Sequence, residues 1–150
     1  MNLLNEVKIT PVLGYYAAGV TERKAPTIID TAGYDGCLFL YLFGTNLLET
    51  AVLNCWIYGH DVDATGGTKL TTATVAHTVT AANALLAKSA IAIDVFQPDP
   101  ALYRYLEASI DPDMANAEIL GIIAIQYNGN VKPDANAVLL ASNIEVFPAA

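Results

Sequence analysis

The chain has 150 residues, of which 54% are hydrophobic and 15% charged, and its formal net charge at pH 7 is −8. A charged share so far below the usual value of about 25% excludes a disordered or highly solvated chain. A folded domain of this size exposes roughly 7,300 Å², or about one charge per 330 Å² for 7 basic and 15 acidic residues. Because this is sparse for a lone monomer, we expect other subunits to cover part of the apolar surface.

The charge distribution argues against nucleic acid and membranes as partners. The seven basic residues are scattered, apart from the neighbours Arg23 and Lys24, so the chain lacks a phosphate-binding stripe. Residues 1–6 lack the basic start and apolar core of a secretory signal. The longest uncharged stretches are residues 36–48, which are too few to span a bilayer, and residues 70–87, which are rich in threonine.

The N-terminal part is predicted to form an arm. Within residues 6–16, Val7, Ile9 and Val12 are interrupted by Pro11, which is typical of an edge strand or of an arm laid along a neighbour. We therefore divide the chain into an arm or edge strand at 1–25 and a β-sandwich domain at 26–150. A brief strand is expected at 27–30.

Two central runs are apolar at both odd and even positions, which predicts strands covered on both faces of the sheet. The first, 37–43, follows a turn at 33–36, and the second, 51–58, is closed by Gly59. Residues 44–50 are predicted to join them as a hairpin. In that register Cys37 faces Tyr58 and Cys55 faces Leu40, so we expect two buried free thiols instead of a disulfide.

The rest of the chain continues this pattern of short apolar runs and turns. We expect an exposed loop at 60–70, a strand-like stretch at 71–80, a short helical turn at 81–88 and a strand at 90–96. A strand at 102–110 is stopped by Asp111-Pro112-Asp113, and a strand at 118–127 is followed by an Asn128-Gly129 turn. A last strand is expected within 137–147. Seven or eight strands at this spacing predict an all-β fold. We expect an antiparallel, jelly-roll-like β-sandwich with an extended N-terminal arm and at most one short helix.

The polar residues do not form a recognisable reactive site. Asp61, Asp63 and Gly66 resemble half of a calcium loop without its third oxygen ligand and distal glutamate, so a solvated turn is favoured over a metal site. His60 and His77 lack zinc spacing, and no serine near them has a nucleophile context. We expect no metal, no cofactor and no enzymatic activity. The test of that expectation is Asp94, because a buried Asp94 beside a histidine in a cleft would favour an enzyme.

Aromatic residues are the strongest candidates for contacts with partners. They could build a sugar-binding platform, but most lie in apolar strands, where core or interface packing is favoured. The candidate interface residues are Val7, Ile9, Val12, Tyr15, Tyr16, Tyr41, Phe43, Trp56 and Tyr58.

Three segments carry a resemblance to a known group of proteins. They are Ile29-Asp30-Thr31-Ala32-Gly33-Tyr34-Asp35-Gly36 leading into 37–43, Leu102-Tyr103-Arg104-Tyr105-Leu106, and 117–128 with its ending Ile-Gln-Tyr-Asn. The pattern resembles small virion proteins of tailed bacteriophages, of the head decoration or cement type with a β-sandwich fold.

The resemblance implies a non-enzymatic structural protein on the outer capsid surface of the virion. Such a protein binds the assembled lattice of the major capsid protein, often as a homo-trimer, and stabilises it by mass action. Residues 1–25 could then add a strand to a neighbouring sheet. The alternative is a tail- or fibre-associated β-sandwich module that binds a host glycan.

Overall fold

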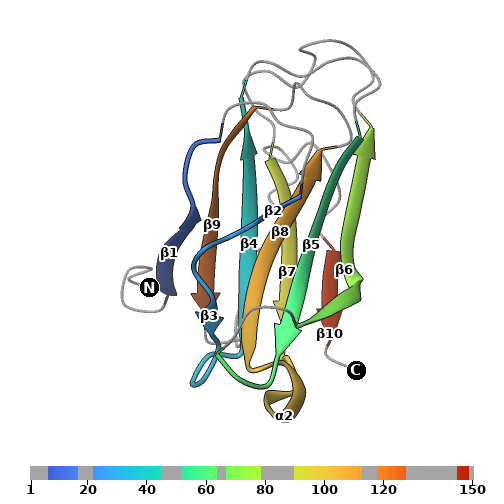
Figure 1. The fold of residues 1–150 in the computed structure, drawn as a ribbon. Helices are drawn as coiled ribbons and strands as arrows, with labels where there is room; N and C mark the ends of the chain where they lie inside the picture. Colours follow the sequence, from blue (N-terminus) through green and yellow to red (C-terminus); the bar gives the residue numbers. More distant parts are fainter. Residues whose placement is uncertain are drawn as a thin grey trace.

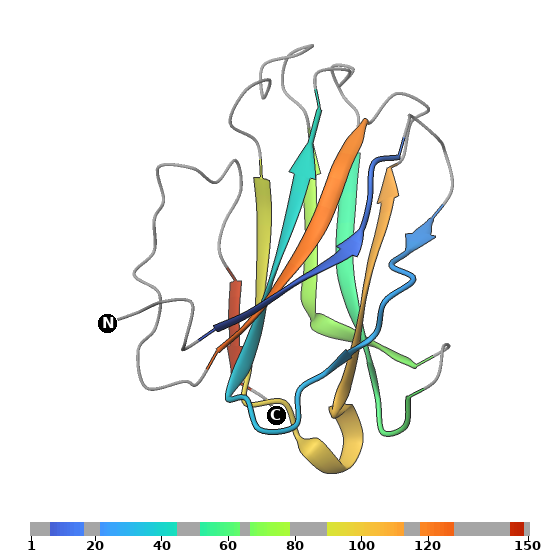
Figure 2. The ribbon, with the colours of Figure 1, turned by 90° about the vertical axis from the view of Figure 1, so that its left-hand side faces the viewer.

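In the computed structural model, the chain folds into two β-sheets that pack face to face (Figure 1). The structure describes residues 7–16, 22–44, 52–63, 67–78, 90–112, 118–127 and 145–148. The view from the side separates the sheets into two layers (Figure 2). The expected all-β sandwich is confirmed.

The first sheet, here called sheet A, contains the N-terminal and C-terminal strands. Its order is β1 (Val7–Leu13), β9 (Ile119–Tyr127), β4 (Gly36–Phe43), β7 (Ala90–Phe96) and β10 (Glu145–Pro148). All neighbours are antiparallel except β7 and β10, which are parallel. The edge position of β1 agrees with the edge strand that Pro11 predicted.

The second sheet, sheet B, covers the inner face of sheet A. Its order is β2 (Arg23–Lys24), β8 (Tyr105–Pro112), β5 (Val52–His60) and β6 (Thr68–Thr78), and β3 (Ile29–Asp30) also pairs with β8. The two-residue strands β2 and β3 raise the number of strands in the described residues to ten, instead of the seven or eight expected.

The core lies between the sheets and follows the alternation of each strand. In β4 the side chains of Cys37, Phe39, Tyr41 and Phe43 are buried among the core residues, whereas those of Leu38, Leu40 and Leu42 are only partly buried. Alternate residues of a strand point to opposite faces, so the three leucines lie on the outer face of sheet A. The chain covers the inner face of β4 fully and the outer face only in part, so the expected coverage on both faces is incomplete.

The predicted hairpin between 37–43 and 51–58 is wrong. β4 pairs with β7 and β9, whereas β5 pairs with β6 and β8, so the chain passes from sheet A to sheet B between Gly44 and Val52. Cys37 therefore lies opposite Val95 and Gln126, and Cys55 opposite Val75 and Ile110. A run that is apolar at both parities does not reveal which sheet it joins. Both cysteines are nevertheless free and buried, as expected.

The predicted strand at 102–110 begins too early. Pro100–Tyr103 form a helical turn, α2, in which the Asp99 side chain accepts a hydrogen bond of 2.9 Å from the Ala101 amide. Asp before Pro is a strong helix start, and it overrides the β propensity of Leu102 and Tyr103. Strand β8 then begins at Tyr105 and continues to Pro112, two residues beyond the predicted end at Ile110 and within the predicted stop.

Other boundaries shift by a few residues. The predicted loop at 60–70 is shorter, because His60 ends β5 and β6 begins at Thr68. The predicted helical turn at 81–88, the turn at 128–129 and residues 137–144 of the predicted last strand lie outside the described residues.

Candidate interaction surface

The outer face of sheet A presents apolar side chains in cross-strand rows. Residues paired in register share a face of the sheet, and each row crosses β1, β9, β4 and β7 in that order. The first row is Pro11, Ile123, Leu40 and Ala92, the second is Ile9, Ile125, Leu38 and Asp94, and the third is Val7, Tyr127, Gly36 and Phe96. Leu42 adds to the same face, opposite Ala90. We call this surface the outer apolar face.

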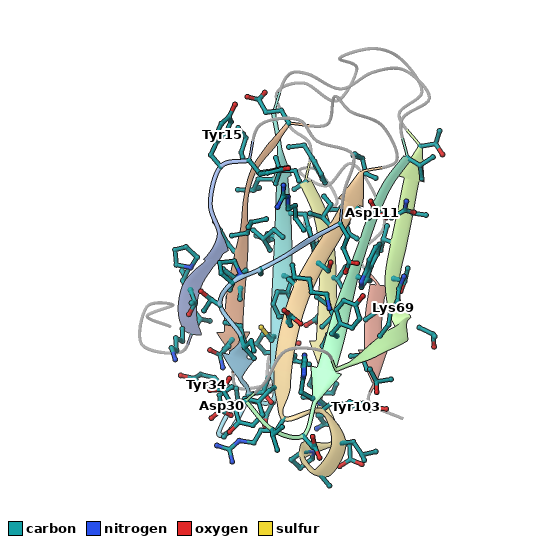
Figure 3. The ribbon with its side chains drawn as sticks, in the orientation of Figure 1. Tyr15, Asp30, Tyr34, Lys69, Tyr103 and Asp111 are labelled. Atoms are coloured by element: carbon teal, nitrogen blue, oxygen red, sulfur yellow. The ribbon has the colours of Figure 1, made fainter. Side chains whose placement is uncertain are left out.

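Exposure is greatest at the β1 side of the outer apolar face. Ile9 is 51% exposed, and Leu38, Leu40, Ile123 and Ile125 are partly exposed. On β7 the residues of the first two rows are buried, because Ala92 and Asp94 are only 1% and 5% exposed. Tyr15, which is 65% exposed, follows β1 at one end of the sandwich (Figure 3). The surface that a partner could contact is therefore centred on β1, β9 and β4.

Asp94 is the one charged residue in these rows. The Tyr127 hydroxyl donates to it, at 2.6 Å from Oδ1 and 2.8 Å from Oδ2. Burial and the neighbouring Asp94 raise the pKa of Tyr127 well above its ordinary value, which keeps the donor protonated. Because the carboxylate is buried and hydrogen-bonded, the exposed part of the outer apolar face carries no charged group from these rows.

The condition that would have favoured an enzyme is not met. Asp94 is buried, but it lies in sheet A, whereas His60 and His77 belong to strands of sheet B. His60 instead faces Glu107, with 3.4 Å between Nε2 and Oε2, and both side chains are almost fully buried. A Cβ atom on Gly67 would lie 2.6 Å from the His60 ring, so the Gly67 backbone packs directly on that ring.

The outer face of sheet B is covered by its own cations. Lys69 Nζ lies 3.6 Å from the centre of the Trp56 ring, and Lys24 Nζ lies 4.1 Å from that of Tyr58. The two rings meet edge to face at 74°. The Tyr58 hydroxyl donates to Glu22, which also accepts from Ser109. Rings that are mutually perpendicular and capped by lysines favour packing over a coplanar platform for a glycan.

The structure separates the nine predicted interface residues into three groups. Val7 and Ile9 lie on the outer apolar face, and the exposed Tyr15 follows the same strand. Val12, Tyr41 and Phe43 are buried in the core, and Tyr16 packs against it. Trp56 and Tyr58 lie on the outer face of sheet B, where Trp56 is 6% exposed.

The prediction missed most of the outer apolar face, including its partly exposed aliphatic residues on β4 and β9: Leu38, Leu40, Leu42, Ile123 and Ile125. The available signal was the pair of long runs, 37–43 and 118–127, that are apolar at both parities. Finding the face also required knowing that these runs become neighbouring strands, which follows from a pairing between residues far apart in the sequence.

The described residues contain no group of three or more His, Cys, Asp or Glu side chains placed to hold a metal ion. Asp61 and Asp63 are exposed in the segment after β5. Within the same described ranges, no helix has the length and apolarity needed to cross a bilayer.

Comparison with protein-family models, curated proteins and solved structures found no match to this chain.

Proposed function

We propose that this chain is a non-enzymatic structural protein of a virion, which assembles as a homo-oligomer, with a trimer expected, and binds the outer surface of an assembled capsid lattice as a decoration or cement protein. The observation that carries the proposal is the outer apolar face, which the single chain leaves partly exposed. The resemblance of three sequence segments to decoration proteins adds the capsid as the partner.

The size of the face suits a protein contact. From Gly36 to Leu42 the face measures roughly 20 Å along the strands, and the three strands that expose it, β1, β9 and β4, together are roughly 15 Å wide, given usual strand rise and spacing. A patch of this order, about 300 Å², is as large as the largest apolar patch on many monomers, and such patches commonly mark interaction sites.

A second copy of the chain is the occupant that the charges favour. Each copy carries a net charge of −8, so two copies repel each other wherever acidic surfaces meet. The outer apolar face offers a contact without exposed charge, because Asp94 is buried against Tyr127. We therefore assign this face to the contact between copies, which leaves the remaining surface for the lattice.

Capsid reinforcement then follows from mass action. A protein that binds only the assembled shell stabilises each occupied site by about 2.7 kcal/mol when its free concentration is 100 times the dissociation constant. Many sites on one shell multiply this contribution. No covalent chemistry is needed for this function.

The proposal is tested by the mass of the protein in solution and by its binding to capsid shells. The matched variant combines Ile9→Glu with Ile125→Lys, because these residues are direct cross-strand partners and the new charges form an ion pair that preserves the strand pairing. We expect light scattering to give an oligomer for the wild type and a monomer for this variant, whereas Ala76→Glu on the exposed surface of β6 leaves the mass unchanged.

Capsid binding is measured by co-sedimentation with purified shells that lack decoration protein. We expect the wild type to pellet with shells and to raise their resistance to heat. A wild type that is monomeric at all concentrations and stays in the supernatant contradicts the proposal.

A further inference from the structure

One end of the sandwich, here called the loop end, brings together three connections that are distant in sequence. They are residues 31–35 before β4, residues 61–63 after β5, and residues 97–104, which contain α2. The paired residues Gly36 with Phe96 and His60 with Tyr105 place these connections at the same end of the strands. In Figure 3, Asp30, Tyr34 and Tyr103 mark this end, and Tyr15 marks the opposite one.

Hydrogen bonds fix the loop end in one arrangement. The Arg104 guanidinium donates to both carboxylate oxygens of Asp30, at 2.8 Å each, and the Arg104 carbonyl accepts from the Thr31 hydroxyl at 2.7 Å. The main-chain amide of Gln97 donates to the main-chain carbonyl oxygen of Asp35 at 2.6 Å. Because residues 31–35 and 97–104 are held together in this way, a partner that binds them loses little conformational entropy.

Close packing adds to this rigidity on the side of β5. A Cβ atom on Gly59 would lie 2.5 Å from the Tyr103 ring, so α2 packs directly on the backbone at the end of β5. The adjacent Leu102 is 53% exposed.

The surface of the loop end combines apolar tips with negative charge. Val62 and Leu102 are 58% and 53% exposed, and they are two of the five large hydrophobic residues exposed within the described ranges. Asp61 and Asp63 flank Val62 in sequence, and both are exposed, as is Asp35 in the connection before β4. The single basic residue of these segments, Arg104, is engaged by Asp30.

We propose that the loop end is the surface that docks on the capsid lattice, and that it fits a basic protein surface with a shallow apolar depression. This inference rests on the proposed function, since the lattice is taken as the partner. Charge complementarity selects the partner, because an acidic rim gains affinity and association rate from a basic surface. The exposed Val62 and Leu102 supply the apolar contact that such an interface needs at its centre.

The location of the loop end is compatible with the proposed oligomer. The outer apolar face lies along the side of the strands, whereas the loop end lies at their tips (Figures 1 and 2). A rotation axis parallel to the strands therefore places the loop ends of all copies on the same side of a cyclic oligomer. All copies could then contact the lattice at once, which multiplies the affinity.

The test uses two loop-end variants and one control on the full chain. The first variant is Val62→Glu with Leu102→Glu, and the second is Asp61→Asn with Asp63→Asn. All four residues are exposed, so each variant should keep the oligomer mass and melting temperature of the wild type. The control is Ala76→Glu, which adds a charge on the exposed surface of β6.

Binding to undecorated capsid shells is measured by co-sedimentation at several salt concentrations. We expect the first variant to lose about tenfold or more in affinity, the second to bind more weakly with a smaller dependence on salt, and the control to bind as the wild type does. Equal binding by the wild type and both loop-end variants overturns the inference while leaving the proposed function intact. Failure of the wild type itself to bind shells overturns both.

Discussion

The hydroxyl of Tyr41 in β4 donates a hydrogen bond of 2.9 Å to the main-chain carbonyl oxygen of Trp56 in β5. Tyr41 is fully buried, so this bond crosses the core and joins sheet A to sheet B without access to water. Burial raises the pKa of the Tyr41 hydroxyl well above its ordinary value, which favours the protonated form that donates this bond.

Replacing Tyr41 by Phe should lower the free energy of unfolding by about 1 kcal/mol, because the ring still fills the core but the buried carbonyl loses a donor. Urea denaturation measures the change. Tyr15→Phe is the matched control, since Tyr15 is 65% exposed, and it should change stability by less than about 0.5 kcal/mol. Equal effects of the two substitutions would show that the bond between the sheets contributes nothing.

Gly36→Ala should destabilise the fold by roughly 1–3 kcal/mol through steric displacement of Tyr127. A Cβ atom at Gly36 would lie 2.5 Å from the Tyr127 hydroxyl oxygen, which is also the donor to Asp94. Gly14 offers the control, because a Cβ atom there would meet nothing within 4 Å. Gly14→Ala should be neutral or stabilising by up to about 1 kcal/mol. The packing is different from that described if Gly36→Ala is as well tolerated as Gly14→Ala.

Neither cysteine should react with a thiol reagent in the folded protein. Cys37 and Cys55 are each 0% exposed, and burial raises the pKa of both thiols well above the ordinary value, so the reactive thiolate is scarce. A colorimetric disulfide reagent should detect two thiols in denaturant and none within minutes under native conditions. Immediate native reaction of one thiol would contradict its burial.

Acid should weaken the contact between Asp30 and Arg104. Hydrogen bonds from Arg104 lower the pKa of Asp30 from 3.8 to about 2. A depressed carboxyl pKa contributes stability above the unfolded value, and that contribution disappears as the pH falls from 3.8 through about 2. Both side chains are 43% exposed, so solvent screening limits the contribution to about 1 kcal/mol or less.

The matched variant for this contact is Asp30→Asn, which keeps an oxygen for the Ala32 amide but removes the charge. Urea denaturation should show the wild type more stable than the variant at about pH 6, and the difference should shrink as the pH falls below 3.8 and be lost below about pH 2. A difference that stays constant across this range would mean that the charge of Asp30 plays no part.

Local patterns in the sequence were sufficient for the fold class and for several strands. Strand β7 occupies the predicted residues 90–96, because a run with Ile91, Ile93, Val95 and Phe96 ends abruptly at Gln97-Pro98. Strand β9 follows the apolar run from Ile119 to Tyr127 in the same way. Both runs are marked by composition and by flanking turn residues, which are properties of the chain that do not depend on distant partners.

Pairing between distant residues could not be predicted in the same way. Strands β4 and β5 are neighbours in sequence and both apolar, so a hairpin was the simplest arrangement, yet they face each other across the core through Tyr41 and Trp56. The outer apolar face depends on the pairing of Leu38 with Ile125, and of Leu40 with Ile123. The helical start at Asp99-Pro100, in contrast, is a local signal. The β-prone Leu102 and Tyr103 that follow it favour a strand, and the sequence prediction followed them.

The order of pairing also has a consequence for how the protein is made. Val7 in β1 pairs with Tyr127 in β9, and Arg23 in β2 pairs with Ile110 in β8. Within this chain, β1 and β2 are therefore translated before the strands that they pair with, β9 and β8. Until those strands are made, β1 and β2 have unpaired backbone groups. We therefore expect slow folding and assistance from chaperones during synthesis.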